Sequence, residues 1–220
     1  KEQLSYPQAA RWLLCVNGYD DTSAKPKGKG LPSVGAGWLG KIGFIQAQGN
    51  SLYETLMLNL TLLRDGRECW GENKPCWELD VPKSAERTGI CCPDNPAELL
   101  TLQSRRLLLH RTGENVDGFY LLGGDFFPRE NAFAEQMTIW RTIPIKKNEP
   151  VVFVPCRHDP SKQLWREFPA VFCQESGHRP GLVCWIEELQ DKRLGFLNPR
   201  RKIHFRISGV QYGDKDFFVN

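Results

Sequence analysis

Apolar residues recur along this chain at two spacings, every three or four positions as in helices and every second position as in strands. Ser5 followed by Pro7 predicts the start of a first helix, which ends near Gly18. Ser51, followed three residues later by a glutamate, forms a capping-box pattern and predicts a second helix that ends at Gly66. The apolar face of this second helix is expected to consist of Leu52, Leu56, Leu60 and Leu63.

Two more helices and five strands follow from the same patterns. A third helix is predicted to start at Asn95-Pro96, and a last one to run from Pro180 to about Leu194. The predicted strands are Lys41–Ala47, Arg106–Arg111, Met137–Ile145, Val151–Cys156 and Ile203–Ser208. The third and fourth of these strands flank Lys146–Glu149, which predicts a hairpin. Tyr212–Lys215 has the composition of a turn or hairpin tip.

Helices and strands alternate without the regular strand–helix–strand units of a parallel sheet, which favours the α+β fold class. With 220 residues, of which 40% are hydrophobic and 25% charged, the chain is long enough to bury a core. We expect residues 1–220 to form a single irregular domain of short sheets and several helices. Arg67–Pro93 is expected to be a long insertion held by Trp70 and Trp77. No stretch approaches ~18 consecutive apolar residues, so no membrane-spanning helix is predicted.

The segment Thr22–Tyr53 has the most unusual composition, with four lysines, seven glycines and no acidic residue. It contains Lys25–Gly30, which reads Lys-Pro-Lys-Gly-Lys-Gly. Glycine lets a ligand approach the main chain closely, and lysine supplies a positive potential. This combination suits a phosphate backbone, whereas the alternative interpretation is a solvated loop.

A second segment without acidic residues lies between Asp191 and Asp214. Its basic residues are Lys192, Arg193, Arg200, Arg201, Lys202 and Arg206. The net charge of the whole chain is only +3, so the distribution of charge is more informative than its total. We expect both basic segments to contribute to one anion-binding surface, unless acids from elsewhere in the chain balance them.

The chain has eight cysteines and no CxxC pair, and we expect reduced thiols in a cytoplasmic protein. Cys15 and Cys184 lie in helical apolar patterns and are expected to be small buried residues. A zinc site formed by four further cysteines stays an alternative, although their C-x6-C…CC spacing is irregular. These are Cys69, Cys76, Cys91 and Cys92. Because the chain starts at Lys1 without a methionine or an apolar leader, we expect it to be part of a longer protein.

Sequence motifs of catalysis do not occur: there is no G-x-S-x-G, no H-E-x-x-H and no P-loop. His158 near Cys156 is the arrangement that comes nearest to a thiol nucleophile with its base. Two residues that are so close at the end of a strand have poor geometry for that chemistry. We therefore expect no catalytic residue, no metal and no cofactor in a protein that is not an enzyme.

The order of features along the chain resembles a known family. The basic glycine-rich loop leads into Gly37-Trp-Leu-Gly40, a strand, and then Gly49–Leu60 with its Leu56-Met-Leu-Asn59-Leu60 core. This order resembles the N-terminal domain of CasA, the large subunit of the type I-E Cascade CRISPR surveillance complex. The resemblance continues through Pro75–Trp77, Gly118-Phe119, Gly181–Gln190 and the turn after Gly209. It implies that the chain is most of one CasA-like domain, without the C-terminal helical bundle.

The resemblance also implies a function. CasA-like subunits recognise the protospacer-adjacent motif in double-stranded target DNA, help to open the strands and support recruitment of a helicase–nuclease. The implied partners are this DNA, the crRNA, the other Cascade subunits and the helicase–nuclease, with no membrane. The isolated chain is expected to be a monomer.

Three elements contact DNA in the family: a glycine loop, a lysine finger and a glutamine wedge on a hairpin. By position, the glycine loop falls near Lys27–Gly30, and the wedge falls near Gln211–Lys215, with Asp214 at its tip. The lysine finger falls near Leu121–Asp125, which contains no lysine, and Arg129 is the nearest basic residue. The predicted nucleic-acid-binding residues are Lys25, Lys27, Gly28, Lys29, Gly30, Gln211, Gly213, Asp214 and Lys215.

Two other functions stay open from the sequence. The first is a protein-interaction scaffold in which Trp70, Trp77 and Phe126-Phe127 are exposed anchors. The second is a zinc- or thiol-dependent hydrolase that uses Cys156, His158 or the four-cysteine group.

Overall fold

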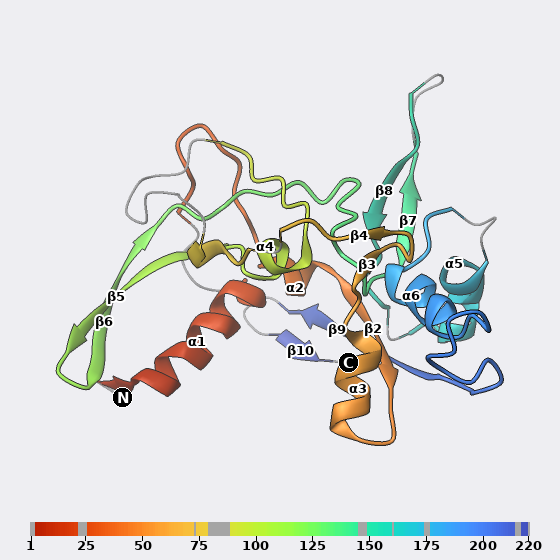
Figure 1. Ribbon diagram of the computed structural model, residues 1–220. Helices are drawn as coiled ribbons and strands as arrows, with labels where there is room; N and C mark the ends of the chain where they lie inside the picture. The colour runs from red at the N-terminus through yellow and green to blue at the C-terminus, as the bar shows by residue number, and fades with distance from the viewer. Residues whose placement is uncertain are drawn as a thin grey trace.

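Short antiparallel strands, grouped in small sheets, organise the chain (Figure 1). The computed structural model describes residues 3–21, 26–72, 74–78, 89–144, 149–159, 161–173, 177–213 and 217–219. The strands are β1 (Leu4–Ser5), β2 (Gly43–Gln48), β3 (Leu63–Arg64), β4 (Glu68–Cys69), β5 (Arg106–Thr112), β6 (Asn115–Leu122), β7 (Trp140–Ile143), β8 (Val152–Pro155), β9 (His204–Tyr212) and β10 (Phe217–Val219). They pair in the orders β1-β6-β5, β10-β9-β2, β3-β4 and β7-β8.

Helices connect and cover these sheets, and the predicted α+β class is confirmed. The helices are α1 (Tyr6–Gly18), α2 (Trp38–Lys41), α3 (Leu52–Asn59), α4 (Pro96–Leu100), α5 (Phe168–Phe172), α6 (Gly181–Leu189) and the 3-10 turns η1 (Cys76–Glu78) and η2 (Leu164–Glu167). The predicted strands correspond to β2, β5, β7, β8 and β9, while α2, α5 and β6 were not predicted. The tip of the β7–β8 hairpin, predicted at Lys146–Glu149, lies outside the described residues except for its last position.

The predicted helix starts are confirmed by their caps. The Gln8 side chain accepts a hydrogen bond from the Ser5 backbone N–H at 3.1 Å at the start of α1. Ser51 Oγ accepts from the Glu54 N–H at 3.1 Å before α3, and Asn95 Oδ1 accepts in the same way before α4. Each side chain satisfies a backbone donor that the first helical turn leaves free.

Two predicted helix ends were wrong. α3 stops at Asn59, whose side chain leaves the helix pattern and bonds both backbone groups of Ala47 on β2, at 2.8 and 3.0 Å. α6 stops at Leu189, because the Asp191 carboxylate accepts the Arg193 N–H at 2.8 Å and forms a local turn that competes with the helix.

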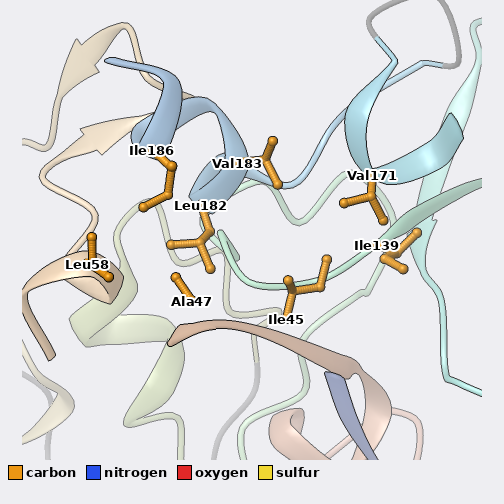
Figure 2. Packing of buried hydrophobic residues seen from close by; sticks show 8 residues of the cluster. All are labelled: Ile45, Ala47, Leu58, Ile139, Val171, Leu182, Val183 and Ile186. Atoms are coloured by element: carbon orange, nitrogen blue, oxygen red, sulfur yellow. The ribbon is translucent and has the colours of Figure 1, made fainter. Parts of the chain in front are cut away.

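The predicted apolar face of α3 was also wrong. Leu52, Leu56 and Leu60 are exposed, and the buried residue of this helix is Leu58. Leu58 belongs to a core in which α3, α5 and α6 pack over β2 and the segment before β7 (Figure 2). The residues of this core are Ile45, Ala47, Leu58, Ile139, Val171, Leu182, Val183 and Ile186.

A second core lies around α2 and anchors the segment that precedes it. Trp38 packs on Phe127 with ring centroids 4.8 Å apart, and its indole N–H donates to Glu135 Oε2 at 2.8 Å. Burial raises the pKa of the Glu135 carboxyl, although the Trp38 hydrogen bond opposes this shift. A further hydrogen bond, from the Gly43 N–H to the Cys156 carbonyl at 3.1 Å, joins β2 to the end of β8.

Candidate nucleic-acid interface

The C-terminal end of α1 connects the elements that the sequence predicted to bind nucleic acid. Gly37, in the middle of the glycine-rich segment, lies so close to α1 that a Cβ atom there would come within 1.7 Å of the Asn17 carbonyl oxygen. From the other side, the Tyr212 hydroxyl at the end of β9 donates to the Tyr19 carbonyl at 2.5 Å. The glycine-rich segment and the β9–β10 hairpin are therefore fixed to neighbouring residues.

The predicted glycine loop is at the surface. Lys27 and Lys29 are exposed, and neither forms an ion pair with the part of the chain that the structure describes. Gly28 between them is buried, and its carbonyl accepts the Leu31 N–H at 3.0 Å, which closes a turn. Gly30 has φ +74°, a conformation that favours glycine. Lys25 lies outside the described residues.

The glycine loop lies directly on the segment predicted to hold the lysine finger. A Cβ atom on Gly123 would lie 2.6 Å from the Gly28 nitrogen and 2.7 Å from the Lys27 carbonyl oxygen. Neighbouring Asp125 is buried, and its backbone and side chain pair with the backbone of Gln103 at 2.8 and 3.0 Å. Leu121–Asp125 is thus a support for the loop, and the acid in it faces inward.

Arg105 holds this region together from beneath, a role that the sequence did not reveal. Its side chain is fully buried and donates to the carbonyls of Gly35 at 2.9 Å and Asp20 at 3.2 Å. Burial lowers the pKa of the Arg105 guanidinium, and the nearby Asp20 and Asp21 carboxylates oppose this shift. The available signal was the Arg105-Arg106 pair directly before an apolar strand, and the structure buries both arginines.

The predicted hairpin forms, with β10 antiparallel to β9 and Phe217 opposite Tyr212. Gln211 and Gly213 are exposed at its end, while Asp214 and Lys215 lie outside the described residues. The Tyr212 ring packs on Gly40 of α2, where a Cβ atom would come within 1.9 Å of its hydroxyl oxygen. Burial raises the pKa of the Tyr212 phenol to about 12.

Positive side chains gather next to this hairpin. The Arg157 guanidinium lies over the Tyr212 ring, 5.4 Å from its centroid. Burial, together with the positive charges of Arg129 and Arg157, lowers the pKa of Lys41 to about 8. The sequence had singled out Arg129, but it missed Lys41 and Arg157 as members of one group, because a hydrogen bond between the backbones of Gly43 and Cys156 brings them together.

The part of the second basic segment that lies between α6 and β9 does not join this surface. Arg193 forms an ion pair with Asp191 at 2.6 Å, and Arg201 forms one with Glu54 of α3 at 2.5 Å. Its loop runs beside α5 and α6, whereas the segment before α2 lies at the opposite side of the view (Figure 1). For Arg193 and Arg201 the alternative, a solvated face balanced by acids, is therefore correct.

The structure gives little support to the hydrolase alternative. Among the described residues, no three His, Cys, Asp or Glu side chains gather closely enough to hold a metal ion. Burial raises the pKa of the Cys156 thiol, which donates to the Arg157 carbonyl at 3.4 Å. A thiol in such surroundings is a poor nucleophile. The His158 ring packs against Gly43, and burial lowers its pKa.

Of the aromatic anchors proposed for a scaffold, only Trp77 is exposed among the described residues. Phe127 is buried in the second core, and Phe126 is half-buried. Trp70 is half-buried as well, with its indole N–H donating to the Thr61 carbonyl at 2.9 Å. Cys15 and Cys184, predicted to be buried, are half-buried in α1 and α6.

The pattern of a basic glycine loop before α2, a capped α3 and a late hairpin can be compared with known proteins. The family model of CRISPR-associated protein Cse1 matches residues 1–217. The chain belongs to the Cse1 family. No curated protein matches the chain.

Solved Cse1 structures share the fold. The structure of Thermobifida fusca Cse1 is 29% identical with a TM-score of 0.74, and the match covers 100% of this chain and 46% of that one. Thermus thermophilus CasA (Cse1) is 16% identical with a TM-score of 0.64, covering 99% and 47%. A chain from a CRISPR RNA-guided surveillance complex is 18% identical with a TM-score of 0.58, covering 99% and 44%. The chain therefore spans less than half the length of these matched chains.

In the described residues, no helix has both the length and the apolar character that a membrane crossing requires.

Proposed function

We propose that this chain is the DNA-facing part of a non-catalytic subunit in a type I-E CRISPR surveillance complex of the cytoplasm. In this role it recognises the protospacer-adjacent motif of double-stranded target DNA, assists strand opening and supports recruitment of a helicase–nuclease. Membership of the Cse1 family supports the assignment to such a complex. The chemistry of the surface around the end of α1 supports the assignment to DNA.

The observation that carries the proposal is the close packing of the glycine loop on Gly123. The two backbones are in direct contact there, because a Cβ atom on Gly123 would lie only 2.6 Å from the Gly28 nitrogen. One side of the loop is therefore packed against the Gly123 backbone. Lys27 and Lys29 on the same loop are exposed. A fixed loop with a small profile and two outward ammonium groups suits the minor groove of duplex DNA, about 6 Å wide, with phosphates on both sides.

The hairpin end at Gln211–Gly213 supplies the second contact in this proposal. Proteins that press side chains between base pairs from the minor groove offset the cost of unstacking with additional protein–DNA contacts. Tyr212 anchors the hairpin base on both Gly40 and Tyr19, which provides the rigidity that such a wedge requires.

A pair of double variants of the full-length subunit, assembled in its complex, tests the proposal. Lys27→Ala with Lys29→Ala is expected to weaken duplex binding at least tenfold, since two phosphate contacts are lost. Lys192→Ala with Lys202→Ala removes the same charge from exposed positions on the other basic segment and is expected to leave affinity unchanged. Equal affinity of both double variants and the unmodified complex would refute DNA recognition by this loop.

An interaction scaffold remains a second candidate because of one apolar groove. The groove has a volume of about 720 Å³ and lies between α1 and the β5–β6 hairpin. Trp12 and Phe119 line it and are 59% and 62% exposed. Exposed aromatic residues in a groove of this size are typical of protein-binding surfaces. Retained complex assembly together with loss of duplex binding in the Lys27/Lys29 variant would separate the two functions.

A further inference from the structure

We propose that Lys41 and Arg157 form a second phosphate-binding site, which holds the backbone of duplex DNA beside the β9–β10 hairpin. This inference rests on the proposed function and adds to it residues that neither the glycine loop nor the predicted wedge contains. Lys41 ends α2, and Arg157 follows β8.

A hydrogen bond between two backbone segments places the two cations close together. The Gly43 N–H, two residues after Lys41, bonds the carbonyl of Cys156, the residue before Arg157, at 3.1 Å. Arg157 then lies over the Tyr212 ring at 5.4 Å, and the same tyrosine packs on Gly40 beside Lys41. Tyr212 contacts both the Arg157 guanidinium and the residue before Lys41, so the two cations lie close to the end of the hairpin.

This grouping of positive charge is unfavourable for the folded chain alone. Lys41 faces the positive charges of Arg105, Arg129 and Arg157, and Asp21 is the acid whose charge opposes them. The Arg105 guanidinium donates hydrogen bonds to backbone carbonyls, whereas Arg157 is exposed. Like charges held together at a surface gain most when an anion binds, and a phosphate diester is the anion that the neighbouring loop is proposed to bind.

Duplex DNA fits the pair better than a protein partner does. An acidic peptide would bind in many orientations, whereas the phosphates of a duplex recur at a regular spacing along each strand and engage fixed cations in register. The Arg157 side chain is pre-positioned by its stack on Tyr212, which reduces the entropy lost when it binds an oxygen.

The test uses the full-length subunit in its assembled complex and duplex DNA of fixed sequence, titrated at several salt concentrations. Lys41→Met with Arg157→Gln is expected to lower affinity about tenfold or more. It should also reduce the slope of log K against log salt by about 2, because two phosphate contacts are lost. The loss should be similar for duplexes with different protospacer-adjacent motifs, since phosphates carry no sequence information.

Two controls make the result specific. Lys202→Met with Arg200→Gln removes the same charges from exposed positions and should leave the slope unchanged. Lys41→Arg, with Arg157 unchanged, keeps both charges and the stack on Tyr212, so it should retain most of the affinity. Thermal unfolding of each variant reports on the fold directly.

The outcomes separate this inference from the proposed function. If Lys27→Ala with Lys29→Ala weakens duplex binding but Lys41→Met with Arg157→Gln does not, the second site is refuted and the proposed function stands. If neither double variant changes affinity, both are refuted. If the Lys41/Arg157 variant lowers incorporation of the subunit while the affinity per assembled complex is unchanged, the pair is a subunit contact and the inference is wrong.

Discussion

The Tyr212 hydroxyl donates a hydrogen bond to the Tyr19 carbonyl at 2.5 Å, joining residues that are 193 positions apart in the sequence. Through this bond the β9–β10 hairpin is attached to the end of α1, where Gly37 of the glycine-rich segment also packs. The relative position of hairpin and loop thus depends on a few contacts, and each of them can be changed separately.

Removing the Tyr212 hydroxyl tests that attachment. Tyr212→Phe keeps the ring beneath Arg157 but loses the hydrogen bond, so the free energy of unfolding should fall by about 1 kcal/mol. Tyr120→Phe is the matched control, because Tyr120 is 64% exposed on β6 and should change stability by less than about 0.5 kcal/mol. Urea denaturation measures both. Equal stability of the Tyr212→Phe and unmodified proteins would show that the bond contributes nothing.

A methyl group on Gly123 should displace the glycine loop. Gly123→Ala places a Cβ atom 2.6 Å from the Gly28 nitrogen, and backbone on both sides cannot move without cost. We expect a loss of about 1–3 kcal/mol in stability and weaker duplex binding. Gly71→Ala serves as control, since no atom lies within 4 Å of a Cβ there. Duplex affinity that is unchanged in Gly123→Ala would mean that the loop need not sit on Gly123.

Duplex affinity should depend on pH through Lys41. Its pKa is lowered from 10.5 to about 8, and bound phosphate favours the charged form, so affinity should fall as the pH rises above about 8. Lys41→Arg should remove this dependence, because a guanidinium stays charged throughout. Fluorescence anisotropy between pH 7 and 9 measures the effect. Parallel pH profiles for both proteins would argue against a role of Lys41 in binding.

The same shift has the opposite effect on stability. The folded chain releases the Lys41 proton before the unfolded chain does, so the free energy of unfolding should rise between about pH 8 and 10.5. Lys41→Met should therefore unfold at a higher temperature than the unmodified protein at pH 7, with the difference shrinking as the pH rises. A lower unfolding temperature of Lys41→Met at pH 7 would contradict the view that the positive charge of Lys41 destabilises the folded chain.

Buried Glu135 should make the second core sensitive to pH. Burial raises its pKa above the ordinary 4.5, so the folded state holds this proton longer and the free energy of unfolding should fall as the pH rises above that value. Glu135→Gln removes this contribution. It also costs stability, because Trp38 and Met137 donate to different oxygens of Glu135 and glutamine has an NH2 donor in place of one of them. The difference in unfolding free energy between the two proteins should therefore depend on pH, and a constant difference would refute the assignment.

Local chemistry made the helix starts predictable. Ser51 and Asn95 cap helices through hydrogen bonds to residues three positions later, and such contacts are visible in the sequence. The leucine spacing after Ser51 gave a wrong prediction of the buried face, because Leu52 and Leu56 are exposed while Leu58 is buried in the core. Periodicity shows that one face is apolar, but it does not show that this face is covered within the chain.

The candidate site was only partly predictable for the same reason. Lys27 and Lys29 stood out by composition, and both are exposed, while their contact with nucleic acid stays a prediction. Arg105, Lys41 and Arg157 became functional candidates only through contacts between distant segments. Contacts between segments far apart in the chain leave no periodic signal in one sequence.

Salt dependence of duplex binding tests the central claim most directly. The affinity of the assembled complex for target duplex should be measured between 50 and 300 mM salt, with unmodified protein and with Lys27→Ala and Lys29→Ala combined. We predict a log–log slope that is shallower by roughly 2 in the double variant, because two phosphate contacts are lost. Identical slopes and affinities for the two complexes would contradict the account.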